Sequence, residues 1–338
     1  MEGHLRRREE NACSDFLSWF DDADRIRLLA ARLINCAPED IAFVSNAASA
    51  LAILLCGLEW RPGDQVITLA DEFPNNLYCR WLLARRGVEF VVVPFERLQE
   101  TVTSKTRLVL LSSVNYATGF EVPLEELSCF LRRHGVLLYV DATQSLGALE
   151  FDVGRLQPAM MAVDAYKWLL GPSGAGFMYV RPDVRCRLAP TVIGWRSHKG
   201  WRQVEELHHG LPEFSEAAER FEGGMLNFPS LYAMGASIEL MLEIGPRNIE
   251  RRVRELAAMA AAVLACCGGS VSGREGGRPL SPVVTARFTS VEASRLAIEL
   301  KRRRVLVSAR HGSLRVSPHF YNDEVDLQRL ETELRRLV

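Results

Sequence analysis

The chain has 338 residues, of which 48% are hydrophobic and 25% are charged. A chain of this length and composition can bury a sizeable core in one large or two ordinary domains, which excludes a disordered protein. The formal net charge of −1 gives no electrostatic reason to expect nucleic acid or a membrane surface as a partner.

The first half of the chain alternates between predicted helices and apolar strands. Ser14 can cap an amphipathic helix over residues 14–36. The predicted order then continues as strand 41–44, helix 46–58, strand 65–69, helix 77–86, strand 88–93, strand 107–111, helix 124–134, strand 136–140 and strand 160–163. Alternating apolar strands and helices indicate an α/β fold with a mostly parallel sheet covered on both faces.

The second half begins with a strand at 176–180 and an irregular stretch at 186–225, which we expect to form loops over a site. A long helical region over 230–266 is interrupted near Gly245-Pro246, and residues 268–277 are predicted to be a flexible connection. Residues 280–338 follow the order strand, helix, two short strands and a helix capped by Asn322-Asp323.

Two domains are expected from this pattern. The first is a large α/β domain over residues 1–244, and the second is a smaller α+β domain over residues 245–338.

Two polar residues stand out because each follows an apolar strand. The run 136–140 ends at Asp141, and Lys167 follows strand 160–163 between aromatic neighbours. Such a pair is what pyridoxal 5'-phosphate (PLP) needs, since the amine forms a Schiff base with the aldehyde and the carboxylate keeps the ring nitrogen protonated. Either residue alone could be a helix cap or a surface amine, but together they predict a PLP-dependent enzyme.

Two further groups could serve the same cofactor. Gln144, three residues after Asp141, could bond the ring hydroxyl. The segment Asn46-Ala47-Ala48-Ser49 lies between a strand and a helix and offers a helix N-terminus with small side chains, which suits a phosphate. An ordinary capped helix would explain the same segment.

Five segments carry a resemblance to a known family. They are Val140-Asp141-Ala142-Thr143-Gln144-Ser145-Leu146-Gly147, Tyr166-Lys167-Trp168-Leu169-Leu170-Gly171-Pro172-Ser173-Gly174, residues 71–76, residues 220–224 and residues 314–322. With them the chain resembles the class V aminotransferase family of fold-type I PLP-dependent enzymes, from about residue 20 to its end. The subgroup indicated is similar to isopenicillin-epimerase-like proteins and, more distantly, to cysteine desulfurases and kynureninases.

The resemblance implies roles around the cofactor. Lys167 would form the Schiff base, Asp141 would bind the pyridinium nitrogen and Gln144 the ring hydroxyl. Phe73 falls where the family places a ring stacked on the cofactor, although a core Phe is an equal alternative, and Tyr166 falls where a residue contacts the phosphate.

The resemblance also implies substrate contacts. Asn115 lies in a loop that approaches the ring and substrate. Arg315 matches the arginine that grips the substrate α-carboxylate, for which a planar guanidinium is suited. Arg310 is a second candidate for the same role.

Three positions depart from the family pattern. Asp164 stands where some relatives have a phosphate-binding Ser, and we expect its carboxylate to point away from the phosphate. Residues 304–313 contain no Cys, which disfavours desulfuration through a protein persulfide. Met225 replaces a Thr that reaches the neighbouring subunit's phosphate.

We therefore expect a homodimeric, PLP-dependent transferase of amino acid metabolism that acts on a small amino-acid substrate, with lyase or epimerase activity as alternatives. A catalytically silent binding or scaffold protein is the alternative from another class. The spacing of His and Cys residues predicts no metal site. A charged N-terminus without a signal peptide, no long apolar run and eight unpaired-looking cysteines predict a cytoplasmic protein.

Overall fold

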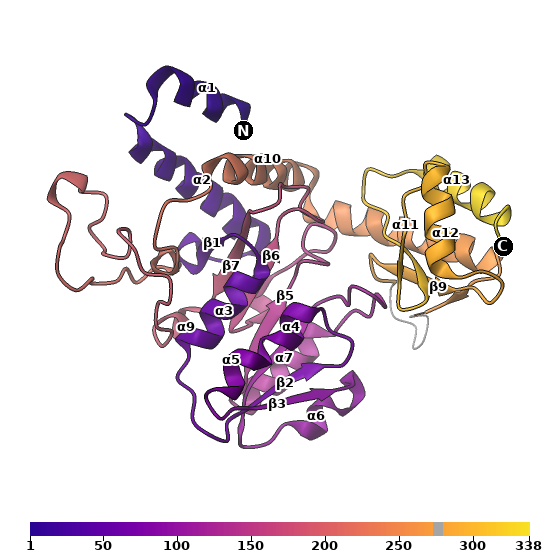
Figure 1. Ribbon diagram of the computed structural model, residues 1–338, viewed down its shortest axis with the longest axis horizontal. Helices are drawn as coiled ribbons and strands as arrows, with labels where there is room; N and C mark the ends of the chain where they lie inside the picture. The colour runs from indigo at the N-terminus through magenta and orange to yellow at the C-terminus, as the bar shows by residue number, and fades with distance from the viewer. Residues whose placement is uncertain (273–279) are drawn as a thin grey trace. The chain divides into compact units, whose positions relative to one another are not determined.

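The computed structural model describes residues 1–272 and 280–338, and its contacts divide the chain into two compact units (Figure 1). Unit 1 comprises Met1–Ser112, Pro123–Leu146 and Phe151–Glu243. Unit 2 comprises Ser113–Val122, Gly147–Glu150 and Ile244–Val338. A domain boundary at 244/245 stays a prediction.

Unit 1 is built on one sheet with helices on both faces. Within the described residues its strands are β1 (Ile41–Val44), β2 (Gln65–Leu69), β3 (Glu89–Val93), β4 (Thr106–Ser112), β5 (Leu137–Asp141), β6 (Met160–Asp164) and β7 (Gly176–Val180). Their order across the sheet is β1-β7-β6-β5-β4-β2-β3. Strands β2 to β6 run parallel, whereas β7 is antiparallel to both β6 and β1. The predicted mostly parallel α/β sheet is therefore confirmed.

The helices of this part of the chain are α1 (Glu2–Asn11), α2 (Phe16–Ile34), α3 (Ala47–Gly57), α4 (Pro74–Tyr78), α5 (Arg80–Ala84), α6 (Leu98–Thr101), α7 (Leu124–Arg133), α8 (Val153–Leu156), α9 (Pro182–Arg185) and α10 (Phe228–Ile244). Helices α3 and α5 share one buried cluster with the sheet, in which Leu54 and Leu83 pack with Leu108 and Met178. Leu127 and Leu131 of α7, which contacts β5, are buried as well. Residues 186–225 hold short 3-10 turns and one isolated β-bridge between His198 and Phe214, as expected of loops.

Two helical predictions differ from the structure. The helix expected over 77–86 begins earlier and is broken into α4 and α5. The N-terminal helix begins at Phe16, and the separate helix α1 precedes it. The buried His4 ring holds α1 against its neighbours, because it lies 4.9 Å from the ring of Trp19 and 5.0 Å from that of Tyr232. Burial lowers the pKa of His4, and nearby arginines lower it further.

Unit 2 contains the antiparallel sheet β10-β11-β9-β8, formed by β8 (Ser270–Val271), β9 (Val284–Arg287), β10 (Ser308–Arg310) and β11 (Ser313–Val316). Its helices are α11 (Pro246–Cys266), α12 (Ala293–Arg302) and α13 (Glu324–Arg335), and their leucines and alanines form its core together with residues of β9 and β11. Asp323 caps α13 as predicted, accepting the N–H groups of Val325 and Asp326. Of the predicted connection 268–277, residues 273–277 lie outside the described part of the chain.

None of the helices that the structure describes combines the length and the apolar composition that crossing a membrane requires. The eight cysteines are all free.

Candidate active site

Asp141 ends β5 as a buried carboxylate. Its Oδ1 accepts the N–H of Thr143 at 2.9 Å, so the chain turns tightly just after the strand. Gln144 is buried in the same turn, which the hydrogen bond from the Ser145 N–H to the Ala142 carbonyl closes at 3.0 Å. Burial raises the pKa of Asp141, while the Thr143 hydrogen bonds and the charge of Lys167 oppose that rise.

Lys167 lies in the loop of a β-hairpin formed by β6 and β7. The Ala165 N–H donates to the Ala175 carbonyl at 3.0 Å, and the Gly171 N–H donates to the Ala165 carbonyl at 2.8 Å. These two bonds close the loop on itself. The half-buried Lys167 amine therefore has a fixed base at the carboxyl end of β6.

Asp141 and Lys167 come together because β5 and β6 are neighbouring parallel strands. Asp141 pairs with Ala162 of β6, so the ends of both strands meet at one edge of the sheet. Lys167 is near enough for its charge to act on both Asp141 and Asp164. Two aromatic rings flank the amine: Lys167 Nζ lies 5.6 Å from the ring centroid of Phe73 and 5.5 Å from that of Tyr166.

The N-terminus of α3 is partly occupied by side chains of the protein itself. Asn46 accepts the Ser49 N–H at 2.8 Å, and the Ala47 N–H donates to Asp164 Oδ1 at 2.6 Å. We expected Asp164 to point away from the phosphate, but its carboxylate lies at the helix end to which the sequence assigned the phosphate. Asp164 is the last residue of β6, which packs on α3, and a free helix N–H attracts a carboxylate within reach.

Glu72 is a buried carboxylate to which the sequence interpretation gave no role. It follows β2 and directly precedes Phe73, and it accepts hydrogen bonds from Ser112 and Asn76. Burial raises its pKa, which those hydrogen bonds oppose. Its position after an apolar strand was a signal of the same kind as that of Asp141.

Arg315, Arg310 and Asn115 belong to unit 2. Arg315 is paired with Ser308 in the β10–β11 ladder, and Arg310 lies two residues further along β10 on the same face. Burial lowers the pKa of Arg315, and the positive charge of the nearby Arg310 lowers it further. A face carrying two guanidinium groups suits a carboxylate.

Asn115 shapes its own loop. Its Oδ1 accepts the N–H groups of Ala117 and Thr118, both at 2.9 Å. The same loop reaches the small sheet, since Tyr116 Oη and His311 Nε2 are 3.2 Å apart. The structure thus groups Asn115 with the β-sheet that carries both arginines.

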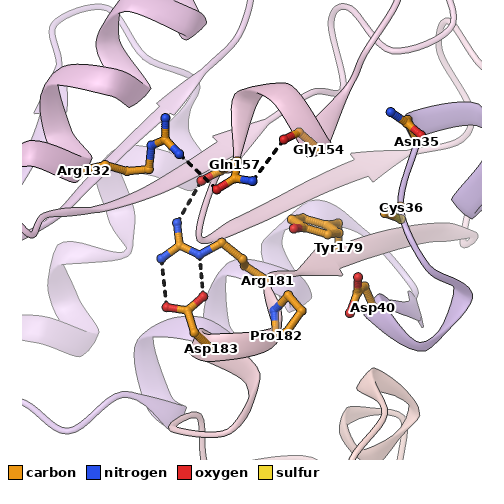
Figure 2. A pocket seen from close by; sticks show the side chains of 10 residues that line it. All are labelled: Asn35, Cys36, Asp40, Arg132, Gly154, Gln157, Tyr179, Arg181, Pro182 and Asp183. Atoms are coloured by element: carbon orange, nitrogen blue, oxygen red, sulfur yellow. Dashed lines mark hydrogen bonds and ion pairs between the residues drawn. The ribbon is translucent and has the colours of Figure 1, made fainter.

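A separate hollow of about 600 Å³ lies at the opposite edge of the large sheet (Figure 2). Tyr179 and Arg181 line it at the amino end of β6, together with Gln157 and Asp183. Its two cations are already engaged, because Arg181 donates to the Asp183 carboxylate and the Gln157 carbonyl, and Arg132 donates to the Gln157 side chain. Since Lys167 follows the carboxyl end of β6, this hollow is not the site formed around Lys167.

In the part of the chain that the structure describes, no group of three or more His, Cys, Asp and Glu side chains is placed to hold a metal ion.

The fold and the grouping of Asp141 and Lys167 at one edge of the sheet suit a PLP-dependent enzyme, and comparison with known proteins gives the family. The family model described as aminotransferase class-V matches residues 18–330. The chain therefore belongs to the class V aminotransferase family, whose enzymes use PLP.

Several relatives show the range within this family. The chain is 28% identical over 309 residues to the uncharacterized aminotransferase YcbU of Bacillus subtilis (strain 168), covering 90% of this chain and 80% of the relative. It is 33% identical over 230 residues to a probable cysteine desulfurase of Methanothermobacter thermautotrophicus, covering 65% and 56%. It is 26% identical over 344 residues to isopenicillin N epimerase of Amycolatopsis lactamdurans, covering 91% and 83%.

Solved structures show the same fold. The cystine C–S lyase C-DES in complex with cysteine persulfide gives a TM-score of 0.90 at 24% identity, covering 99% of this chain and 91% of that one. The apo cysteine desulfurase from Thermococcus onnurineus NA1 gives a TM-score of 0.86 at 22% identity, covering 95% and 84%.

The residues of unit 1 fit the cofactor of this family at its ring. A buried carboxylate, an amine and an aromatic ring lie at one sheet edge, which are the groups that a pyridinium ring with an aldehyde needs. At the N-terminus of α3, where the phosphate is expected, not all backbone N–H groups are open to it, because the Asp164 carboxylate accepts the Ala47 N–H.

Proposed function

We propose that this protein is a PLP-dependent enzyme that acts on an amino acid and, among the reactions of its family, transfers an amino group. The observation that carries the proposal is the grouping of Asp141, Lys167 and Phe73 at the carboxyl edge of one sheet, in a chain that belongs to the class V family. When bound, PLP supplies an electron sink for a bond at the α-carbon of an amino acid.

Each residue then has one task near the cofactor. Lys167 would hold the cofactor through Nζ and move a proton to or from the substrate α-carbon. Asp141 would accept a hydrogen bond from the ring nitrogen, and its buried carboxylate would keep that nitrogen protonated. Gln144 would bond the ring hydroxyl, and Phe73 would cover the ring face.

Other residues would bind the phosphate of the cofactor and the substrate. Ala48 would donate its N–H to the phosphate, and Ala47 and Ser49 would do so by exchanging their bonds to Asp164 and Asn46 for bonds to the phosphate, with Tyr166 beside them. In unit 2, Arg315 would bind the substrate α-carboxylate with two parallel hydrogen bonds, and Arg310 would add positive charge. Asn115 would order the loop next to them.

A lyase acting on a carbon–sulfur bond is the second candidate, supported by the likeness to the C–S lyase C-DES over nearly the whole chain. A persulfide on this protein itself has less support, because residues 304–313 contain no Cys. Epimerisation and a silent scaffold protein are further outcomes that the experiment below separates. Family resemblance also favours a homodimer, which light scattering of the purified protein would test. The free cysteines favour a cytoplasmic location, which cell fractionation would test.

The test starts from the purified protein loaded with PLP. Lysine-bound cofactor absorbs visible light, and reduction with borohydride should fix the label to Lys167 in a peptide map, with Lys167→Ala as the unlabelled control. Label at another lysine, or no binding of PLP, would contradict the proposal.

The reaction type follows from products formed with a panel of amino acids. Transfer of the amino group to an added keto acid identifies a transaminase, and loss of ammonia without an acceptor identifies a lyase. Inversion of the α-carbon identifies an epimerase, and no product with any amino acid favours the scaffold.

A further inference from the structure

Glu72 occupies a buried position that none of the roles above requires. Only 3% of its surface is exposed, although it lies in a connection between β2 and α4. Asp71, just before it, has a φ of 60°, so the chain reverses sharply there. A charged residue in a short connection normally faces water, and its burial therefore needs a physical reason.

Directional hydrogen bonds supply that reason. Glu72 Oε1 accepts the N–H of Ser112 at 2.7 Å. Its Oε2 accepts the Ser112 hydroxyl at 2.6 Å, the side-chain amide of Asn76 at 3.0 Å and the N–H of Phe73 at 3.3 Å. A carboxylate with several donors is held in one orientation, because each bond is charge-assisted and buried.

These donors link Glu72 to the candidate active site from two sides. Ser112 is the last residue of β4 and pairs with Asp141 at the end of β5. Phe73 follows Glu72 in the chain, and its ring lies 5.6 Å from Lys167 Nζ. The carboxylate thus joins the connection that carries the aromatic ring to the strand end beside Asp141.

We propose that Glu72 is a positioning residue that anchors the β2–α4 connection to the end of β4 and so holds the Phe73 ring over the cofactor. The inference rests on the proposed function, since it assumes that PLP binds at Lys167. Glu72 touches neither cofactor nor substrate in this scheme and acts through Phe73.

The test is a double-mutant cycle read out by cofactor binding. The dissociation constant of PLP and the circular dichroism of bound PLP are measured for the wild type, Glu72→Ala, Phe73→Ala and the double variant. Each single variant should weaken PLP binding by about tenfold, and the double variant should bind no more weakly than Phe73→Ala alone. Glu72→Gln should restore most of the affinity and the dichroism, since its amide oxygen can still accept the Ser112 N–H.

Asp40 offers a matched control. It is also a buried carboxylate in unit 1, but it pairs with Arg185 next to the hollow at the opposite edge of the sheet. Asp40→Ala should lower stability and leave PLP affinity unchanged.

Three results would overturn the inference. The first is additive losses in the cycle, and the second is an equal loss of affinity in Asp40→Ala. The third is a wild-type protein that binds no PLP, which removes the proposed function as well and is therefore distinguishable from the other two. If Glu72→Ala does not fold, the cycle is run with Ser112→Ala, which removes only the hydroxyl donor and should also be non-additive with Phe73→Ala.

Discussion

Glu222 lies inside unit 1 between two arginines, and its replacement tests how much this ionic cluster stabilises the fold. Its Oε1 accepts Arg27 Nη1 at 2.7 Å and the Phe43 N–H at 2.9 Å, and its Oε2 accepts Arg196 Nη2 at 2.9 Å. The side chains of Glu222, Arg27 and Arg196 are 0%, 7% and 2% exposed. Water therefore cannot replace a lost partner.

The expected loss follows from what is left behind. Removing one partner of a buried ion pair costs about 3–5 kcal/mol. Leaving the Phe43 N–H without an acceptor costs roughly 1–3 kcal/mol more. We expect Glu222→Ala to lose about 5 kcal/mol or more, and Glu222→Gln about 3 kcal/mol because its amide can still accept one N–H. Urea denaturation followed by circular dichroism measures both, using the transition of unit 1 if the two units unfold separately.

The pH dependence of stability gives a second test of the same cluster. Burial alone would raise the pKa of Glu222, but the charges of Arg27 and Arg196 hold it below its ordinary value. The stabilisation is therefore complete above the unfolded pKa of about 4.3 and is lost as the pH falls towards the folded pKa. The difference between wild type and Glu222→Gln should shrink across that range.

A surface ion pair provides the control for this prediction. Lys199 and Glu213 are 61% and 66% exposed, and Glu213→Gln should produce no resolvable change. Equal urea midpoints for wild type and Glu222→Gln would refute the reasoning.

Three further predictions concern other parts of unit 1. Gly176→Ala should cost about 1–3 kcal/mol in urea denaturation, because its Cβ would lie 2.3 Å from a backbone oxygen of β6, whereas Gly3→Ala meets no atom within 4 Å and should not destabilise. Asp164→Asn should bind PLP about tenfold more tightly than wild type at pH 8, since it removes a negative charge at the end of α3. Burial raises the pKa of Asp164, so this gain in affinity should fall as the pH drops and the wild-type carboxyl protonates. Equal PLP affinities of the two proteins at pH 8 would contradict this prediction. The lowered pKa of His4 means that α1 should detach as the pH falls below about 6.5, which hydrogen exchange of residues 2–11 would show, and His4→Phe should abolish the pH dependence.

Much of the sheet could be predicted because its strands are short apolar runs between clear turns. The predicted strands 41–44, 65–69 and 176–180 coincide with β1, β2 and β7. Helix α1 escaped prediction because its sequence is mostly charged, and it is held by the tertiary contacts of His4, which no local pattern reveals.

In the candidate site, too, some features could be predicted from the sequence and others could not. Asp141 and Lys167 could be chosen from the sequence because the ends of parallel strands meet at one edge of a sheet. The hydrogen-bond partners of Asp164 and Glu72 could not be predicted, because each partner lies far along the chain. Asp164 bonds a residue 117 positions away, and Glu72 bonds one 40 positions away.

The hairpin that carries Lys167 has a consequence for how this protein tolerates change. The chain returns from residue 165 to residue 175 through a bond between those two residues, and β7 then lies between β6 and β1. An insertion inside the loop would move the amine while leaving that closing bond and the strand pairing untouched. A natural change in the length of this loop is therefore expected to abolish activity and to preserve the fold. The number of residues between positions 165 and 175 would then separate catalytically active homologues from inactive ones.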